Sequence, residues 1–148
     1  MIATNHALTG AVIAVVIKQP VLAIPLAFTS HFICDAIPHF GVDLKFNSRA
    51  MYVWLILDGL FALSAAGFLL WYGVESPVLL AMCGFVAMSP DFGWLYYGLN
   101  NKLGKVVEYD TLTKIHHIVQ WYQKVPGIII EVSWATLMIY IIIRAQTI

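Results

Sequence analysis

The sequence predicts an all-α, polytopic transmembrane bundle of about five helices, the first of them short, with one further interfacial helix. Two observations lead to this fold class. Of the 148 residues, 61% are hydrophobic and only 11% are charged, and the mean hydropathy is +0.83, far above what a soluble domain of this size needs. Several apolar runs also approach the ~20 residues of a membrane span. Because no linker interrupts them, we expect one integral-membrane domain, residues 1–148.

The first expected helix covers residues 7–17, with Thr4 or Asn5 as its N-cap. It lacks the basic region and cleavage site of a signal peptide. Four longer runs follow, each bounded by proline or by polar residues: 20–37, 50–72, 77–99 and 126–143. Prolines suit the first turn of a helix, where the missing N–H does no harm. Residues 114–124, after a polar stretch, are expected to lie at the membrane interface.

Charge is distributed unevenly about these spans. With five spans, six of the eight basic residues fall on the N-terminal side: Lys45, Arg49, Lys102, Lys105, Lys114 and Lys124. Lys18 and Arg144 fall on the other side. The positive-inside rule then places the N-terminus in the cytoplasm, which we expect to be that of a prokaryote. No basic stripe suggests a nucleic-acid partner, and Cys34 and Cys83 share no CxxC spacing.

The segment SHFICDAIPHF carries the clearest chemical pattern. His31 and Asp35 are four residues apart, so they share one face of a helix, and His39 would follow at the next turn. Such a pair offers an imidazole and a carboxylate to one metal ion, or a carboxylate that bridges two ions. The alternative is a hydrogen-bonded pair that holds two helices together.

Further ionisable residues are expected in the same layer of the membrane, from other helices and the interfacial segment. They are His6, Asp58, Asp91, His116, His117 and Glu131. Charged groups in the bilayer are costly, and there are too few intramembrane cations to pair with the acids. Each residue still has a structural alternative: His6 as a frayed terminal residue, for example, or Glu131 in a hydrogen bond between helices. Adjacent His116 and His117 point about 100° apart on a helix, so one of the two is expected as a ligand.

Four motifs, NHALTG, SHFICDAIPH, SPDF and HHIVQW, together resemble the small bacterial and archaeal membrane-bound metal-dependent hydrolases. That family is itself similar to zinc-dependent phospholipase C in its His-x-x-x-Asp helix. The motif order differs here, because the His31–Asp35 helix precedes Pro90 and Asp91. The paired histidines also lack the neighbouring arginine of the family.

The resemblance implies hydrolysis at one or more divalent metal ions, with zinc as the expected metal. It implies metal ligands at His6, His31, Asp35, Asp91 and one of His116 and His117, with Asp35 as the bridge. Asp58 or Glu131 would act as general base. The expected substrate is a phospholipid or another amphiphilic phosphoester at the cytoplasmic headgroup layer. Its polar end would be bound by His39, Lys45, Arg49 and Lys114.

Two other functions use the same residues. A proton- or metal-coupled carrier also places acids and histidines inside the membrane. Ionisable residues are nearly absent from the opposite half of the bilayer, however, so no polar path crosses it. In a scaffold, the metal would only hold the helices together, which suits a closed site with four ligands.

Overall fold

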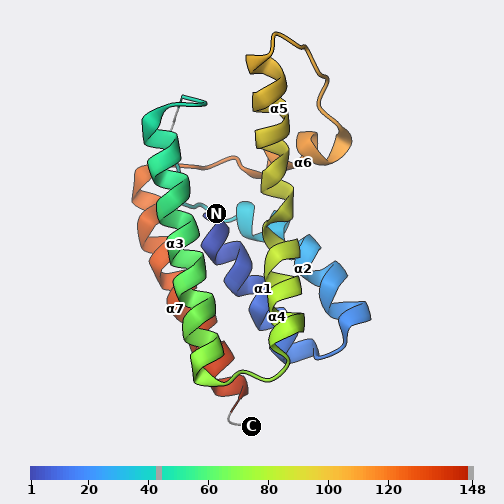
Figure 1. Cartoon of the computed structure of the whole chain (residues 1–148), viewed down its shortest axis with the longest axis vertical. Helices are drawn as coiled ribbons and strands as arrows, with labels where there is room; N and C mark the ends of the chain where they lie inside the picture. Colours follow the sequence, from blue (N-terminus) through green and yellow to red (C-terminus); the bar gives the residue numbers. More distant parts are fainter. Residues whose placement is uncertain (43–44, 147–148) are drawn as a thin grey trace.

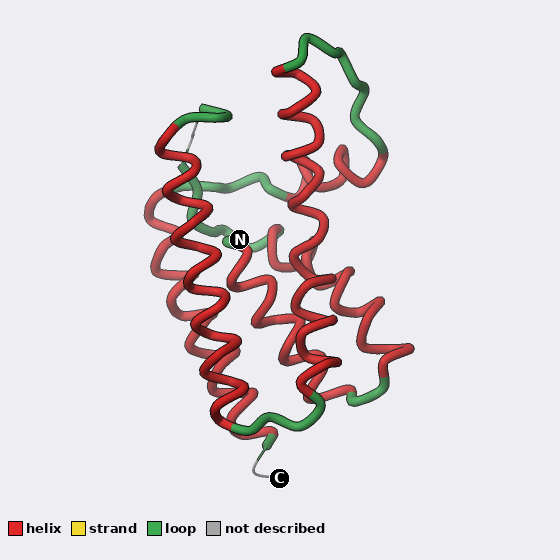
Figure 2. The backbone as a smooth tube through the Cα atoms, in the orientation of Figure 1, coloured by secondary structure: helices red, strands yellow, loops and turns green. Residues whose placement is uncertain are grey.

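The computed structural model describes residues 1–42 and 45–146, and all of its regular elements are helices (Figures 1 and 2). The elements in chain order are α1 (Ala3–Ile17), α2 (Pro20–Asp35), α3 (Arg49–Tyr72), α4 (Pro77–Met88), the 3₁₀ turn η1 (Ser89–Asp91), α5 (Phe92–Lys102), α6 (Thr111–Val119), the 3₁₀ turn η2 (Val125–Gly127) and α7 (Ile128–Ala145). The all-α prediction is confirmed.

The expected number of spans is only partly confirmed. Within the described residues, three helical segments are long and apolar enough to cross a membrane: Arg49–Tyr72, Pro77–Lys102 and Val125–Ala145. α1 and α2 are apolar but shorter, and α1, with 15 residues, is about 22 Å long against a hydrocarbon core of about 30 Å. Large side chains on different sides of α3, such as Phe61 and Leu63, are mostly exposed, as expected for residues that face lipid.

Successive long helices run in opposite directions, so the chain has two distinct ends (Figure 1). At one end, Lys18 Nζ lies 3.2 Å from Glu75 Oε2, and the Glu75 N–H donates to Gln146 Oε1 at 2.8 Å. These contacts join the α1–α2 loop, the α3–α4 loop and the C-terminal end of α7. The loops after α5 and α6 lie toward the opposite end, and the N-terminus lies deeper, about halfway along the bundle (Figure 1). Lys102, Lys105 and Lys124 belong to that opposite end.

α1 lies at the centre of the bundle and packs against α2, α3, α4 and α7. The sequence predicted Thr4 or Asn5 as the N-cap of this helix. That prediction is wrong, because the helix already begins at Ala3 and both residues lie inside it. A carboxylate from another helix replaces the local cap: Asp58 of α3 accepts hydrogen bonds from the N–H groups of Ala3 at 2.8 Å and Thr4 at 3.0 Å. A carboxylate is the favoured partner of the positive end of a helix.

The fourth predicted span is interrupted. Pro90 has no N–H to continue an α-helix, and the chain forms the 3₁₀ turn η1 before α5 begins. The Ser89 hydroxyl donates to the Val86 carbonyl at 2.8 Å. In an unbroken helix the Ala87 carbonyl would accept the N–H of Asp91. In this structure the Ala87 carbonyl accepts a hydrogen bond from the His31 side chain of α2.

α6 is held against the bundle by a short backbone pairing. The His39 N–H donates to the Tyr122 carbonyl at 3.2 Å, and the Lys124 N–H donates to the His39 carbonyl at 3.1 Å. Gly127 packs so closely on the His39 backbone that a Cβ at this position would overlap it. The pairing joins the loop after α2 to the loop after α6, and so brings the α6 face toward the end of α2.

The crossing of α1 and α4 depends on a glycine. A Cβ on Gly10 would lie 2.6 Å from the Cys83 carbonyl carbon and 2.9 Å from Ala87 Cβ. Small residues let membrane helices approach closely. We expect Gly10→Ala to lower the free energy of unfolding in detergent by about 1–3 kcal/mol, as overpacking does. The matched control, Gly59→Ala on α3, has no atom within 4 Å of the new Cβ. Equal stability of the two variants would contradict this account.

Candidate metal site

Four side chains from α2, η1 and α6 bring their ligand atoms together: His31, Asp35, Asp91 and His116. These atoms all lie within 4.8 Å of one another, a spacing that could hold a metal ion. His31 Nε2 and His116 Nε2 are 3.0 Å apart, and His31 Nε2 and Asp35 Oδ2 are 3.3 Å apart. Ligands of a tetrahedral ion with bonds of about 2.0–2.1 Å stand about 3.3 Å apart. The cluster therefore has the dimensions of a compact metal site.

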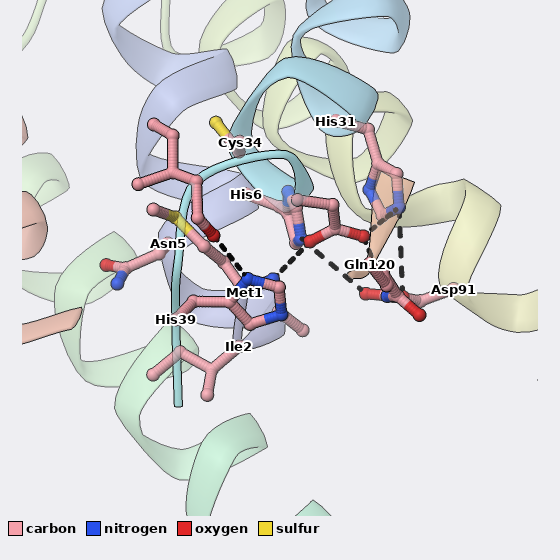
Figure 3. A network of polar contacts seen from close by, with 12 residues as sticks. Met1, Ile2, Asn5, His6, His31, Cys34, His39, Asp91 and Gln120 are labelled. Carbon is pink, nitrogen blue, oxygen red and sulfur yellow. Dashed lines mark hydrogen bonds and ion pairs between the residues drawn. The ribbon is translucent and has the colours of Figure 1, made fainter. Parts of the chain in front are cut away.

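His31 is oriented by the break in the α4–α5 segment. Its Nδ1 lies 2.8 Å from the Ala87 carbonyl, in the last turn of α4 before this break. A carbonyl oxygen can accept a hydrogen bond but cannot donate one. The proton of neutral His31 is therefore on Nδ1, and the lone pair is on Nε2. Orientation of a ligating histidine through its second ring nitrogen is common in metal sites. Figure 3 shows this ring directed toward Asp91 and Gln120.

Asp35 is the centre of the cluster. Its Oδ2 lies 2.7 Å from His116 Nε2 and accepts a hydrogen bond from Gln120 Nε2 at 2.8 Å. Its Oδ1 lies 3.0 Å from His6 Nε2 and also contacts the Met1 nitrogen. The Asp35 side chain is fully buried. A buried carboxylate is destabilising unless hydrogen bonds and positive charge compensate its lost hydration.

The groups that pair with these carboxylates can also bind a metal. The ion pairs of Asp35 and Asp91 across the described residues are formed with histidines and with the Met1 nitrogen. Two imidazole nitrogens that approach to 3.0 Å beside carboxylate oxygens make an electron-rich pocket. A proton or a cation must lie there, and the mixed nitrogen and oxygen donors suit a divalent ion such as zinc.

The cluster opens on one side to a cavity of about 760 Å³. Asp91 and His116 line this cavity, and their side chains are 20% and 13% exposed, whereas those of His31 and Asp35 are fully buried. Aromatic residues form much of the wall: Phe40, Phe46, Trp54, Phe92, Trp94, Tyr97 and Tyr109. The cavity is large enough for a small amphiphile and apolar enough to hold one.

The structure places the two adjacent histidines differently. His116 is in the cluster, while the exposed His117 ring lies against the Tyr109 ring, with centroids 5.0 Å apart and the ring planes tilted by 40°. His117 still lines the cavity. The sequence left open which histidine is the ligand, and the geometry favours His116. Gln120, four residues further along the chain, was not predicted, although this spacing places it on the same face as His116.

The two predicted base candidates make structural contacts. Both oxygens of Asp58 accept hydrogen bonds from Ala3 and Thr4, although the residue lines the cavity. Glu131 is buried and accepts hydrogen bonds from the Ile2 N–H and the Asn5 amide. Both carboxylates therefore hold the first turn of α1, which carries His6, in place.

Of the four predicted substrate-binding residues, one lines the cavity and three do not. His39 is buried and lines the cavity, with its Nδ1 donating to the Ile37 carbonyl at 2.7 Å. Burial lowers the pKa of His39 below its ordinary value. Lys45, Arg49 and Lys114 are exposed and are not among the residues that line the cavity, whereas Lys105 is. Asp110 caps α6 by accepting the Thr113 N–H at 2.8 Å.

Comparison of the chain with protein-family models, with curated proteins and with solved structures finds no match. The resemblance of its four motifs to the membrane-bound metal-dependent hydrolases therefore stays an expectation. The function of the chain is inferred from the geometry of the cluster and the cavity.

Proposed function

We propose that the chain is a membrane-embedded, metal-dependent hydrolase that cleaves a phosphoester of a lipid or another amphiphile. The observation that carries the proposal is the juxtaposition of four metal-competent side chains with an aromatic-walled cavity of about 760 Å³. A site built only to hold helices together needs no such opening. Zinc is the metal that the histidine-rich donor set favours.

His31, Asp35, Asp91 and His116 would hold the ion. Once bound, a divalent metal lowers the pKa of a coordinated water and polarises the phosphoryl oxygen. The buried pair, His31 and Asp35, fixes the position of the site, and Gln120 orients the Asp35 carboxylate through its hydrogen bond at 2.8 Å. Asp91 and His116 face the cavity, so the reacting group would approach from their side.

His39 is the best candidate for the proton acceptor. Its Nδ1 proton is held by the Ile37 carbonyl, which leaves a lone pair on Nε2. Since burial lowers the pKa of His39, the ring is neutral near pH 7 and able to accept a proton. Asp58 and Glu131 are weaker candidates for this role than the sequence suggested, because their oxygens are occupied by hydrogen bonds to α1.

The walls of the cavity suggest how an amphiphile would bind. Aromatic side chains from α3 and α5, such as Trp54 and Trp94, would contact its apolar part. Lys105 is positioned to attract an anionic headgroup. The bias of lysine and arginine toward this end of the bundle supports a cytoplasmic orientation of the site, in a prokaryotic membrane.

The experiment is phosphate release from a panel of lipid phosphoesters in vesicles of defined orientation, with protein purified without a histidine tag. We expect zinc to copurify, and turnover to stop when a chelator removes it and to return when zinc is restored. Turnover should be seen when substrate is supplied to the cytoplasmic face. Metal content with ion flux but no hydrolysis would favour a carrier, and metal content with neither would favour a scaffold.

A further inference from the structure

The cavity lies between faces of two helices, α3 and α5, that do not pack on each other. The lining residues of α3 share one face of that helix: Met51, Trp54, Leu55 and Asp58. Those of the α5 face have the same spacing: Trp94, Tyr97, Gly98 and Asn101. Within the described residues, α3 packs mainly on α1 and α5 mainly on η1, and the two helices stand apart in Figure 1. No direct helix packing therefore closes the space between these two faces.

Both faces lie at the depth of lipid chains. The two helices belong to segments that are long and apolar enough to cross a membrane. Arg49 begins α3 and Lys102 ends α5, and we expect both at the headgroup level, because a charge in hydrocarbon is costly. Leu55 follows Arg49 by six residues and Trp94 precedes Lys102 by eight, so they lie about 9 and 12 Å deeper at 1.5 Å per residue. Half of the hydrocarbon core is about 15 Å thick, so acyl chains rather than water surround α3 and α5 at this level.

Apolar side chains at this level are exposed although they line the cavity. The exposed fractions are 40% for Leu55, 43% for Phe92 and 37% for Trp94. Apolar surface in contact with water costs about 25 cal/mol per Å², so these side chains favour contact with hydrocarbon. The contact across the gap comes from Phe46, in the loop before α3, whose ring packs edge-on against Trp94 and so closely over Gly98 that a Cβ there would overlap it. Gly98 lies one helical turn nearer the headgroups than Trp94, so this contact covers the shallower side of the gap.

The part of the cavity nearer the loops is polar. It is lined by Asn101, Lys105, Thr113, His117 and Gln120. The cavity thus offers apolar walls at the depth of lipid chains and polar walls toward the headgroups, the same order in which a membrane lipid presents its own parts. Asp91 and His116 line the same cavity, so a lipid aligned in this way would bring its phosphoester to the cluster.

We propose that the opening between α3 and α5 is a lateral entrance for a bilayer lipid, whose acyl chains stay in the hydrocarbon while its phosphoester reaches the cluster. This inference rests on the proposed function and narrows its substrate class from amphiphiles in general to lipids that reside in the bilayer. A cavity of about 760 Å³ has the size of sites that hold drug-sized ligands. It therefore holds the polar part of a lipid and the start of its chains, and the rest extends through the entrance. Leu55 and Trp94 form the two edges of the entrance.

The test is to obstruct the entrance reversibly. Cys34 and Cys83 are buried, so an exposed introduced cysteine can be modified selectively. Leu55→Cys that carries a bulky methanethiosulfonate adduct should hydrolyse a long-chain lipid in vesicles at least about tenfold more slowly, a barrier increase of about 1.4 kcal/mol. Reduction of the adduct should restore the rate. A short-chain, water-soluble analogue with the same headgroup should keep its rate, because it enters from the polar side of the cavity.

The matched control is the same adduct on Ile56→Cys. Ile56 lies at the depth of Leu55 and is 61% exposed, but it points about 100° away on the helix and does not line the cavity. This adduct should leave both rates unchanged. If the adduct on Leu55→Cys unfolds the protein, the same adduct on Trp94→Cys tests the opposite edge.

A second measurement needs no hydrolysis. A lipid with a photoreactive group in its acyl chain is incorporated into vesicles with the wild-type protein, and the labelled residues are identified by mass spectrometry. We expect label on Met51 and Met88, which line the cavity. The adduct on Leu55→Cys should prevent this labelling, and the adduct on Ile56→Cys should not.

The outcomes separate the entrance from the proposed function. Equal loss of turnover with both substrates, or no loss with the long-chain lipid, would overturn the lateral entrance even though hydrolysis is observed. Label confined to residues outside the cavity, such as Leu63, would also overturn it. Labelling of Met51 and Met88 that the Leu55 adduct prevents, without hydrolysis of any lipid tested, would support the entrance and count against the hydrolase.

Discussion

Replacing Asp35 with alanine should abolish metal binding and cause the largest loss of stability expected from a single substitution in the cluster. Asp35 contacts His6, His31, His116 and Gln120, so its removal leaves several buried polar groups without a partner. Removing one partner from a buried network of charged groups lowers the free energy of unfolding by about 3–5 kcal/mol. Thermal unfolding in detergent and elemental analysis measure the two effects. His31→Ala should likewise lose metal.

Two further variants separate loss of metal from loss of the fold. Asp35→Asn keeps the shape of the side chain but not its charge, so we expect it to lose metal with a smaller loss of stability. The exposed Glu108→Ala removes an acid outside the cluster and should change stability by no more than about 0.5 kcal/mol. Added zinc should stabilise the wild type and Glu108→Ala by mass action, but neither Asp35 variant. Full metal content in Asp35→Asn would show that the cluster is a hydrogen-bonded structural network.

The largest effect on turnover without loss of metal is expected at His39. Asparagine places its amide near the position of Nδ1, so His39→Asn should keep the hydrogen bond to the Ile37 carbonyl and remove the Nε2 lone pair. Turnover should fall by roughly 10²–10⁴-fold, the usual contribution of a general base. Metal content should stay at the wild-type value, which elemental analysis checks beside the phosphate-release assay.

The pH profile gives an independent measurement of the same role. Burial lowers the pKa of His39 from about 6.5, so the ring is neutral at pH 7 and becomes protonated only at lower pH. Wild-type turnover should therefore fall as the pH decreases below the ordinary histidine range, and this acidic limb should be missing from the residual activity of His39→Asn. If His39→Asn kept the same acidic limb, the fall in turnover at low pH would come from the protonation of another group. Unchanged turnover at neutral pH would remove His39 from the chemistry.

The hydrophobic pattern by itself determined the fold class and most helix positions. Long apolar runs between prolines predicted the helices beginning at Pro20 and Pro77 to the residue, since the cost of an unsatisfied backbone in lipid leaves few alternatives to a helix. The spacing of His31 and Asp35 also fixed their shared face, because four residues are about one helical turn.

Contacts between residues far apart in sequence were decided only by the tertiary structure. The sequence could not show that Asp58 and Glu131 hold the start of α1, because these bonds join residues more than fifty positions apart. Nor could it select His116 over His117, since the choice depends on how α6 is rotated when its loop pairs with His39. The meeting of His31, Asp35, Asp91 and His116 likewise follows from the packing of α2, η1 and α6. Local sequence determines which face of a helix a residue occupies, and packing determines what that face meets.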